Sequence, residues 1–263
     1  MVIPRSGQSI YRRCLDYHEL TKTRRIVNAL TTEIDSIVVF SETDMHKVQN
    51  ARGTVNIIPP GLDAPTTTWS RGHSHLAVFG GAMWRLENEA TAIYLAQQVM
   101  PLVRKSVPDA ELRIFGARPS QAVRALGRQP GITITGEVAD YDAEFRHAQV
   151  ALAPSMVEAG ILIKSLRAMA MGCPVVLNRA SARPLTGLQP GTQALVGDSP
   201  SEIAEHIVGL MLDGARAQRI GNSARSFVSA NYGWDRSATA YLAAFEKLAT
   251  AGTQSAQRGS GRR

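Results

Sequence analysis

Short runs of β-branched and aliphatic residues alternate with amphipathic stretches from about Val38 to Val196. The short runs end at glycine, proline or polar residues, and the stretches between them repeat apolar residues at helical spacing. A chain that alternates strands and helices in this way forms a parallel sheet covered by helices on both faces. We therefore predict an α/β fold built on a doubly wound parallel sheet.

The same patterns predict the individual elements. Strands are expected at residues 36–41, 55–58, 75–80, 111–115, 132–135, 150–153, 174–177 and 194–197. One helix is marked by the apolar stripe Ile93, Ala96, Met100 and Val103, and the last helix by Ala238, Tyr241, Leu242, Phe245 and Leu248. The tail is rich in glycine, serine and glutamine and has no apolar repeat, so residues 250–263 are expected to be a disordered basic segment.

Composition narrows the class of protein. Hydrophobic residues make up 44% of the 263 residues, which is ordinary for a globular chain with one large core or two small ones. No run of about 18 apolar residues occurs, and the start MVIPRSGQSIYRR lacks the apolar centre of a signal peptide. We expect a cytoplasmic protein. Cys14 and Cys173 lack metal-ligand spacing. The histidines form one HxH pair, His73 and His75, which we interpret as loop residues, so we predict no metal site and no cofactor.

The formal net charge of +7 suits nucleic acid, an anionic membrane surface or phosphorylated small molecules. No zinc finger, RNA-binding aromatic motif or basic zipper accompanies the charge, which argues against a nucleic-acid partner. A basic cluster lies on a polar N-terminal helix and comprises Arg12, Arg13, Lys22, Arg24 and Arg25. Weak peripheral contact with the inner face of a membrane is therefore a further expectation.

Glycine turns follow three consecutive predicted strands. Gly81 follows the third strand, Gly116 the fourth and Gly136 the fifth, and a Pro154-Ser155 turn follows the sixth. Because the carboxyl ends of parallel strands meet at one sheet edge, where open α/β sheets bind ligands, we expect these turns to lie together at a binding site. Taken singly, each turn also has a purely structural interpretation, as does Arg85 just after the first.

Two cations, Lys164 and Arg167, lie three residues apart in the stretch EAGILIKSLRAMAMGCPVV, which begins at Glu158. Gly160 opens a predicted helix, Gly172 closes it, and its apolar stripe is Leu162, Leu166 and Met169. Like charges three residues apart repel unless an anion or a carboxylate lies between them. The helix start also offers free N–H groups and a positive dipole end for phosphate. Glu158 is the alternative partner of Lys164 or an acceptor of ligand hydroxyls, and a solvated cationic face is the other interpretation.

Several blocks in order resemble a known family. They are VNIIPPGLD from Val55, HLAVFGGAM from His75, VPDAELRIFGARP from Val107, ITITGEVADYDAEFRHAQVALAPS from Ile132, the stretch from Glu158 and NYGWD from Asn231. Together they resemble the C-terminal half of GT-B-fold glycosyltransferases of family four, the glycosyl transferases group 1, and look most like bacterial sugar transferases of the exopolysaccharide type. The most specific parts are the block K-x-x-x-A-M-A-M-G-x-P-V-V and the succession of glycine turns.

The resemblance implies a Rossmann-like domain that binds a nucleotide-diphosphate sugar, with UDP or GDP as the nucleotide. By position, Gly81 would lie near the diphosphate, and Lys164 and the helix start at Gly160, Ile161 and Leu162 would meet phosphate oxygens and the sugar. The base would be bordered by Gly136, Val138 and Leu166. The implied donor-binding set also includes Arg85, Gly116 and Arg167, and the candidate catalytic residues are Glu158 and Lys164.

The implied function is a retaining glycosyltransferase of polysaccharide biosynthesis, which transfers a hexose to a glycan or a lipid-linked acceptor. Stabilising the leaving diphosphate is then the main electrostatic task, and no protein nucleophile is needed. One departure concerns Arg167, because the family usually has a ribose-binding glutamate there and a guanidinium only donates hydrogen bonds. The lost contact costs about 1.5 to 3 kcal/mol unless Arg167 turns to a phosphate. The paired acidic position is Ala159, with Glu158 displaced by one.

A second departure concerns the domains. Residues 1–58 resemble only a remnant of the N-terminal acceptor domain, and they precede a linker at 59–72, the nucleotide-sugar-binding domain at 73–232 and a helix at 233–249. We expect a truncated enzyme that is inactive alone, or a subunit whose partner chain supplies the acceptor domain. The alternative is a non-catalytic nucleotide-sugar-binding or interaction module.

Overall fold

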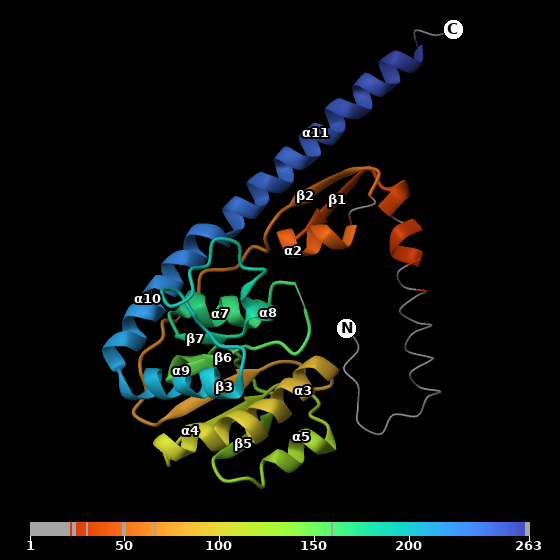
Figure 1. The fold of residues 1–263 in the computed structure, drawn as a ribbon. Coiled ribbons are helices and arrows are strands. Elements are labelled where there is room, and N and C mark those ends of the chain that lie inside the picture. The colour runs from red at the N-terminus through yellow and green to blue at the C-terminus, as the bar shows by residue number, and fades with distance from the viewer. Residues whose placement is uncertain are drawn as a thin grey trace. The chain divides into compact units, whose positions relative to one another are not determined.

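The computed structural model describes residues 22, 25–29, 31–48, 51–65, 67–158 and 160–260 (Figure 1). The chain forms two compact units. One combines Met1–Leu62 with Tyr232–Arg263, and the other is Asp63–Asn231. Cys14, Ala159 and most of the N-terminal basic cluster lie outside the described residues.

A parallel sheet organises the unit Asp63–Asn231. Its strands are β3 (Leu76–Gly80), β4 (Glu111–Phe115), β5 (Ile132–Gly136), β6 (Val150–Leu152), β7 (Val175–Leu177) and β8 (Leu195–Val196). They lie in the order β5-β4-β3-β6-β7-β8, and every neighbouring pair is parallel. The order reverses between β3 and β6, as it does at the switch point of a doubly wound sheet. The predicted fold class is therefore confirmed, and each predicted strand of this unit is present.

Helices cover both faces of this sheet. The first group comprises α3 (Leu86–Tyr94), α4 (Met100–Ser106), α5 (Gln121–Leu126) and α9 (Pro200–Leu212), in which α3 contacts α5 and α4 contacts α9. The second comprises α6 (Ala143–Arg146), α7 (Ile163–Met171) and α10 (Gly214–Asn231), and α7 contacts both of the others. A short α8 (Arg179–Ala182) follows β7. After β3 the chain moves toward one end of the sheet, to β4, and after β6 it moves toward the other end, to β7. Because both connections are right-handed, the two groups of helices lie on opposite faces of the sheet.

Helix α7 differs from its prediction at one end only. It closes at Gly172, as predicted, in a left-handed conformation with φ of 88°. Its first helical residue is Ile163 rather than Gly160, because Leu162 is still extended and takes the N-cap position. Helix α10 packs closely against the C-terminus of α7, since a Cβ on Gly221 would collide with the carbonyl oxygen of Gly172.

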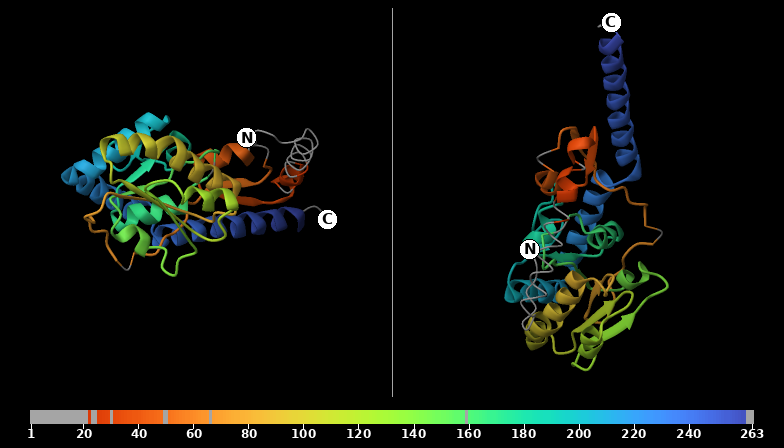
Figure 2. Two further views of the ribbon diagram at one scale, coloured as in Figure 1. Left: turned by 90° about the horizontal axis from the view of Figure 1, so that it is seen from below. Right: turned by 90° about the vertical axis from the view of Figure 1, so that its right-hand side faces the viewer.

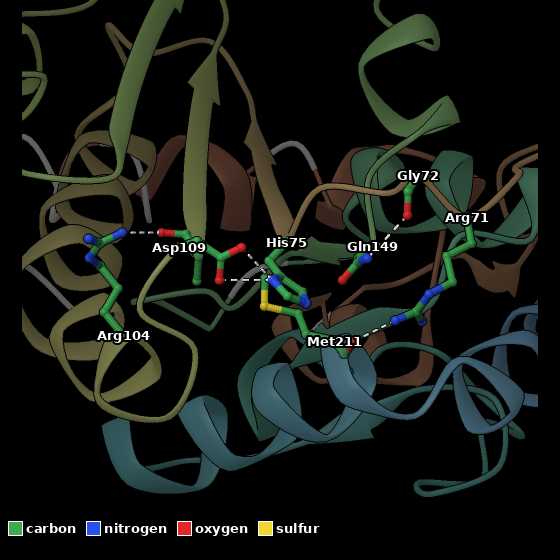
Figure 3. Close-up of polar contacts among 8 residues, drawn as sticks. Arg71, Gly72, His75, Arg104, Asp109, Gln149 and Met211 are labelled. Atoms are coloured by element: carbon green, nitrogen blue, oxygen red, sulfur yellow. Dashed lines mark hydrogen bonds and ion pairs between the residues drawn. The ribbon is translucent and has the colours of Figure 1, made fainter.

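Polar side chains form hydrogen bonds at the amino-terminal edge of the sheet (Figure 3). The guanidinium of Arg71 donates to the last carbonyls of α9, those of Leu210 and Met211, where a cation also complements the helix dipole. His75 lies just before β3, and its Nδ1 is 2.9 Å from a carboxylate oxygen of Asp109. That hydrogen bond lowers the pKa of Asp109.

The end of the predicted linker packs as part of this unit. Trp69 is only 7% exposed, and its backbone N–H donates to the carbonyl of Met171 at 2.8 Å. Its indole Nε1 donates to the carbonyl of Ala148. Trp69 is therefore anchored to the unit Asp63–Asn231 by two hydrogen bonds.

The other unit contains a two-stranded parallel sheet and a long helix. Strands β1 (Ser36–Val39) and β2 (Thr54–Ile57) pair in parallel, and α2 (Glu42–Met45) lies between them in the sequence. Helix α11 is continuous from Trp234 to Ser260 (Figure 2). This helix extends beyond residue 249, where the last helix was predicted to end, and residues 250–260 contain no proline that would interrupt it. None of the helices described is long and apolar enough to cross a membrane.

The glycine turns at the carboxyl edge of the larger sheet lie together, as predicted. The N–H of Gly81 donates to the carbonyl of Phe115 at 3.1 Å, and the N–H of Gly116 donates to that of Gly136 at 2.6 Å. Gly116 has a φ of 131°, and a Cβ there would collide with the carbonyl oxygen of Gly81. Only glycine permits both the backbone conformation and the close approach.

We expect Gly116→Ala to lower the free energy of unfolding by about 2 to 4 kcal/mol, because backbone strain and a steric clash act together. Gly191→Ala is the matched control, since Gly191 also has a positive φ, of 84°, with nothing within 4 Å of its Cβ position. It should cost about 1 to 2 kcal/mol. Urea denaturation measures both, and equal losses would refute the role given to the contact between Gly81 and Gly116.

Candidate functional site

A cleft of about 440 Å³ opens at the carboxyl edge of the sheet, within the unit Asp63–Asn231. Its walls come from the turn after β3, the first turns of α3, the turn after β6 and the start of α7. Because β3 and β6 are adjacent and their helices diverge to opposite faces, this is the switch-point crevice in which doubly wound sheets bind ligands. The lining residues are Ala82, Arg85, Glu87, Asn88, Thr91, Pro154, Ser155, Gly160, Ile161, Leu162, Ile163 and Lys164.

The start of α7 forms one wall of the cleft. Gly160, Ile161 and Leu162 lead into the helix, and no side chain in the described part of the chain caps it. The first N–H groups of a helix have no intrahelical acceptor, and the helix dipole adds partial positive charge at this end. The wall is therefore suited to an anionic ligand.

The ammonium of Lys164 adds a full charge at this wall. Its Nζ donates to Oδ1 of Asn88 at 2.9 Å and lies 4.2 Å from the ring centroid of Phe79. No carboxylate among the described residues lies within 4.0 Å of this ammonium. Burial penalises its charged form and lowers the pKa of Lys164 to about 7, against the opposing influence of Glu87. Lys164 is thus a partly desolvated cation held by a neutral amide.

The other charges of the cleft cancel one another. Arg85 Nε lies 2.6 Å from Oε1 of Glu87, and both residues line the cleft. Lys164 thus makes no ion pair of its own among the described residues, although Glu87 acts on its charge from a longer distance.

Arg167 and Lys164 contact different protein side chains. Its Nε donates to Oδ1 of Asp142 at 2.9 Å, and its guanidinium carbon lies 5.3 Å from the ring centroid of Tyr141. This hydrogen bond raises the pKa of Arg167. The like charges are separated because each has its own partner on a different element.

Other predicted site residues lie outside the cleft lining. Leu166, predicted to border the base, is 0% exposed and packs in the core. Glu158 lies 3.8 Å from Arg183 and pairs with that residue rather than with Lys164. Val138 is a partly exposed residue of the loop after β5.

Three glycines of the predicted set, Gly81, Gly116 and Gly136, lie in the turns at the sheet edge and do not line the cleft. Gly81 and Gly116 hydrogen-bond to neighbouring turns, as described above, and Gly136 has a φ of 75° with nothing within 4 Å of its Cβ position. Arg85, Gly160, Ile161, Leu162 and Lys164 are the predicted residues that the cleft brings together.

The sequence analysis missed two polar residues of α3. Asn88 and Thr91 both line the cleft, and Thr91 is 2% exposed. They lie three residues apart on the buried side of α3, continued by Ala92 and Leu95, which are both fully buried. Two polar residues at the start of an otherwise apolar helix face could have indicated that this end of α3 lines a site.

Charged and polar side chains from both walls line the cleft, among them Arg85, Glu87, Asn88, Ser155 and Lys164. Among the described residues, no group of three or more His, Cys, Asp and Glu residues could hold a metal ion. The hydroxyl of Thr91 donates to the carbonyl of Glu87 at 2.7 Å, within α3.

Comparison with known proteins identifies the family. Residues 74–213, more than half of the chain, match the model of glycosyl transferases group 1. The chain is 27% identical over 244 residues to a GDP-mannose-dependent alpha-(1-6)-phosphatidylinositol monomannoside mannosyltransferase of Mycobacterium tuberculosis, found in two strains. That alignment covers 82% of this chain and 63% of the relative, so the chain spans less than two thirds of the relative's length.

Solved structures share the fold at low sequence identity. Sucrose-phosphate synthase from Thermosynechococcus elongatus superposes with a TM-score of 0.71 and 20% identity, over 88% of this chain and 62% of that one. Anabaena HepE in complex with UDP and glucose gives 0.70 and 15%, over 87% and 67% of the two chains. A mutant of TarM from S. aureus, in complex with fondaparinux, alpha-GlcNAc-glycerol and UDP, gives 0.70 and 13%, over 84% and 46%. The fold is that of GT-B glycosyltransferases, and the chain belongs to the family of glycosyl transferases group 1.

Proposed function

We propose that the cleft binds the diphosphate of a nucleotide-sugar donor, and that the chain is the donor-binding part of a glycosyltransferase. The observation that carries the proposal is the ammonium of Lys164, which lines the cleft beside the uncapped start of α7 with no carboxylate partner among the described residues. Burying such a charge is unfavourable unless an anion compensates for it. A diphosphate supplies that compensation.

In this proposal the same groups also serve catalysis. Breaking the bond between the sugar and the diphosphate leaves negative charge on the departing phosphate. Lys164 and the N–H groups of α7 are already oriented toward that charge, so they stabilise the transition state without reorganisation. We propose transfer of a hexose with retention of configuration, and no residue of the cleft is required as a nucleophile.

The relatives support a choice of donor and acceptor. The mycobacterial relative is named for GDP-mannose and a phosphatidylinositol monomannoside, and HepE is bound to UDP. We propose a UDP- or GDP-sugar as the donor and a glycan or lipid-linked acceptor in polysaccharide biosynthesis, with cytoplasmic action at the inner face of a membrane. Acceptor binding is proposed to require groups beyond the cleft, from this protein or from a partner chain.

We expect calorimetric titration at pH 7 to detect binding of UDP or GDP by the full chain. Lys164→Ala should weaken that binding about ten- to a hundredfold, because it removes a charge-assisted hydrogen bond to phosphate. Lys105→Ala is the matched control, since Lys105 is an exposed lysine of α4 outside the cleft lining. Arg167→Gln, which removes the other cation of α7, should change affinity by less than about threefold because Arg167 is occupied by Asp142.

Two outcomes would contradict the proposal. One is a folded wild-type chain that binds neither nucleotide more tightly than its monophosphate. The other is a Lys164→Ala variant whose affinity equals that of Lys105→Ala.

Nucleotide binding should also depend on pH in a defined direction. The diphosphate binds the protonated form of Lys164, whose pKa is lowered to about 7 in the free protein. As pH rises above 7, binding must include uptake of a proton, so affinity for UDP should fall by up to about tenfold per pH unit. Titration between pH 7 and 9 keeps the terminal phosphate, with a pKa of about 6, ionised.

The control for the pH dependence is Lys164→Arg, because a guanidinium stays charged throughout this range. Its affinity for UDP should vary little between pH 7 and 9, whatever its absolute value. A wild-type profile as flat as that of Lys164→Arg would show that Lys164 does not titrate with the bound ligand.

A further inference from the structure

Asn88 connects three elements through a single side-chain amide. Its Nδ2 donates to the carbonyl of Ala82, in the turn after β3, at 3.1 Å, and its Oδ1 accepts from Nζ of Lys164, on α7, at 2.9 Å. Asn88 itself lies in the first turn of α3, where its backbone N–H donates to the carbonyl of Arg85. Both ends of the amide are therefore engaged, and its orientation is fixed by a donor and an acceptor on different elements.

The glycine turn leaves room for this amide. A Cβ on Gly81 would lie 2.9 Å from Nδ2 and 3.0 Å from Cγ of Asn88, closer than side chains normally approach. The amide of Asn88 thus fills the space that a side chain at residue 81 would need. A Cβ at residue 81 would therefore require the amide of Asn88 to shift from this position.

The chemistry of the amide explains why this residue is not an acid. An ammonium has three N–H donors, so one hydrogen bond to Asn88 and contact with the ring of Phe79 still leave donors for a ligand. A carboxylate at residue 88 would hold the ammonium in the same place but would cancel its charge.

The charged groups near Lys164 have other partners and do not hold its ammonium in place. Arg85 and Glu87, from the start of α3, pair with each other, and Glu158, from the loop before α7, pairs with Arg183. The amide of Asn88 is therefore the group that holds the ammonium without neutralising it.

We propose that Asn88 is a positioning residue for donor binding. It fixes the ammonium of Lys164 at the wall of the cleft and, being uncharged, keeps the full positive charge available to the donor diphosphate. The inference rests on the proposed function, and it adds a requirement that the residue at position 88 accept a hydrogen bond without carrying a charge.

The test compares the full chain with Asn88→Asp, which has nearly the same shape and one added negative charge. Calorimetry with UDP, GDP and inorganic pyrophosphate should show binding weakened at least about tenfold at pH 7. Asn222→Asp is the matched control, because Asn222 lines a different groove and the substitution changes the net charge equally. It should bind as the wild type does.

A second readout requires no ligand. Carbon-13 NMR of Cε-labelled lysine follows the titration of Lys164, whose signal is identified by its loss in Lys164→Arg, and the other lysines are Lys22, Lys47, Lys105 and Lys247. In Asn88→Asp the pKa of Lys164 should rise, because an opposite charge replaces a neutral acceptor. If Asn88 did not contact Lys164, this titration would be unchanged.

The outcomes separate the inference from the proposed function. Wild-type binding that Asn88→Asp leaves within about twofold, with an unchanged titration of Lys164, overturns the inference alone. A raised pKa of Lys164 in Asn88→Asp, with no binding of any probe by the wild type, supports the contact and overturns the proposed function. If Asn88→Asp does not fold, Asn88→Ala takes its place, and unchanged pyrophosphate affinity in that variant overturns the inference.

Discussion

The site depends on the pairing of β3 with β6 at the centre of the parallel sheet. These strands are neighbours in space although about seventy residues of chain separate them. Because the chain leaves β3 toward one face and β6 toward the other, α3 and α7 begin side by side and then diverge. The crevice between the first turns of α3 and α7 is the cleft. Both helices contribute to its walls because β3 and β6 are paired.

The electrostatics of the cleft follow from that geometry. Helix α7 brings its uncapped N-terminus and Lys164 to one wall, while α3 brings Asn88 and the ion pair of Arg85 and Glu87 to the other. A cation placed between an aromatic ring and an amide is poorly solvated, and its charged form is correspondingly destabilised. The free protein thus carries an electrostatic cost that an anionic ligand removes. In our account this cost links the fold of the unit Asp63–Asn231 to donor binding.

The sequence was sufficient for the strands and for the convergence of the glycine turns. Both follow from local signals, namely β-branched runs and glycines at strand ends, combined with the rule that parallel strands end at one edge. For Leu166, helical periodicity and the family resemblance led to different expectations. Its place in the apolar stripe of α7 indicated burial, as the structure shows, but position in the resembled family suggested contact with a base. For this residue, helical periodicity was the better guide.

The partners of the charged residues could not be predicted from the sequence. Lys164 meets Asn88 across 76 residues of sequence, and Arg167 meets Asp142 across 25. No local pattern encodes such contacts, since they arise only when crossover helices and loops settle on the folded sheet. Spacing on one helix suggested a shared anion, whereas tertiary structure gives each cation its own partner.

A crystal structure of the full chain with UDP or GDP at a saturating concentration tests the central claim most directly. The account predicts that the diphosphate occupies the cleft, with phosphate oxygens within hydrogen-bonding distance of Nζ of Lys164 and of the first N–H groups of α7. A nucleotide bound elsewhere, or a diphosphate in the cleft that makes no contact with Lys164, would contradict it.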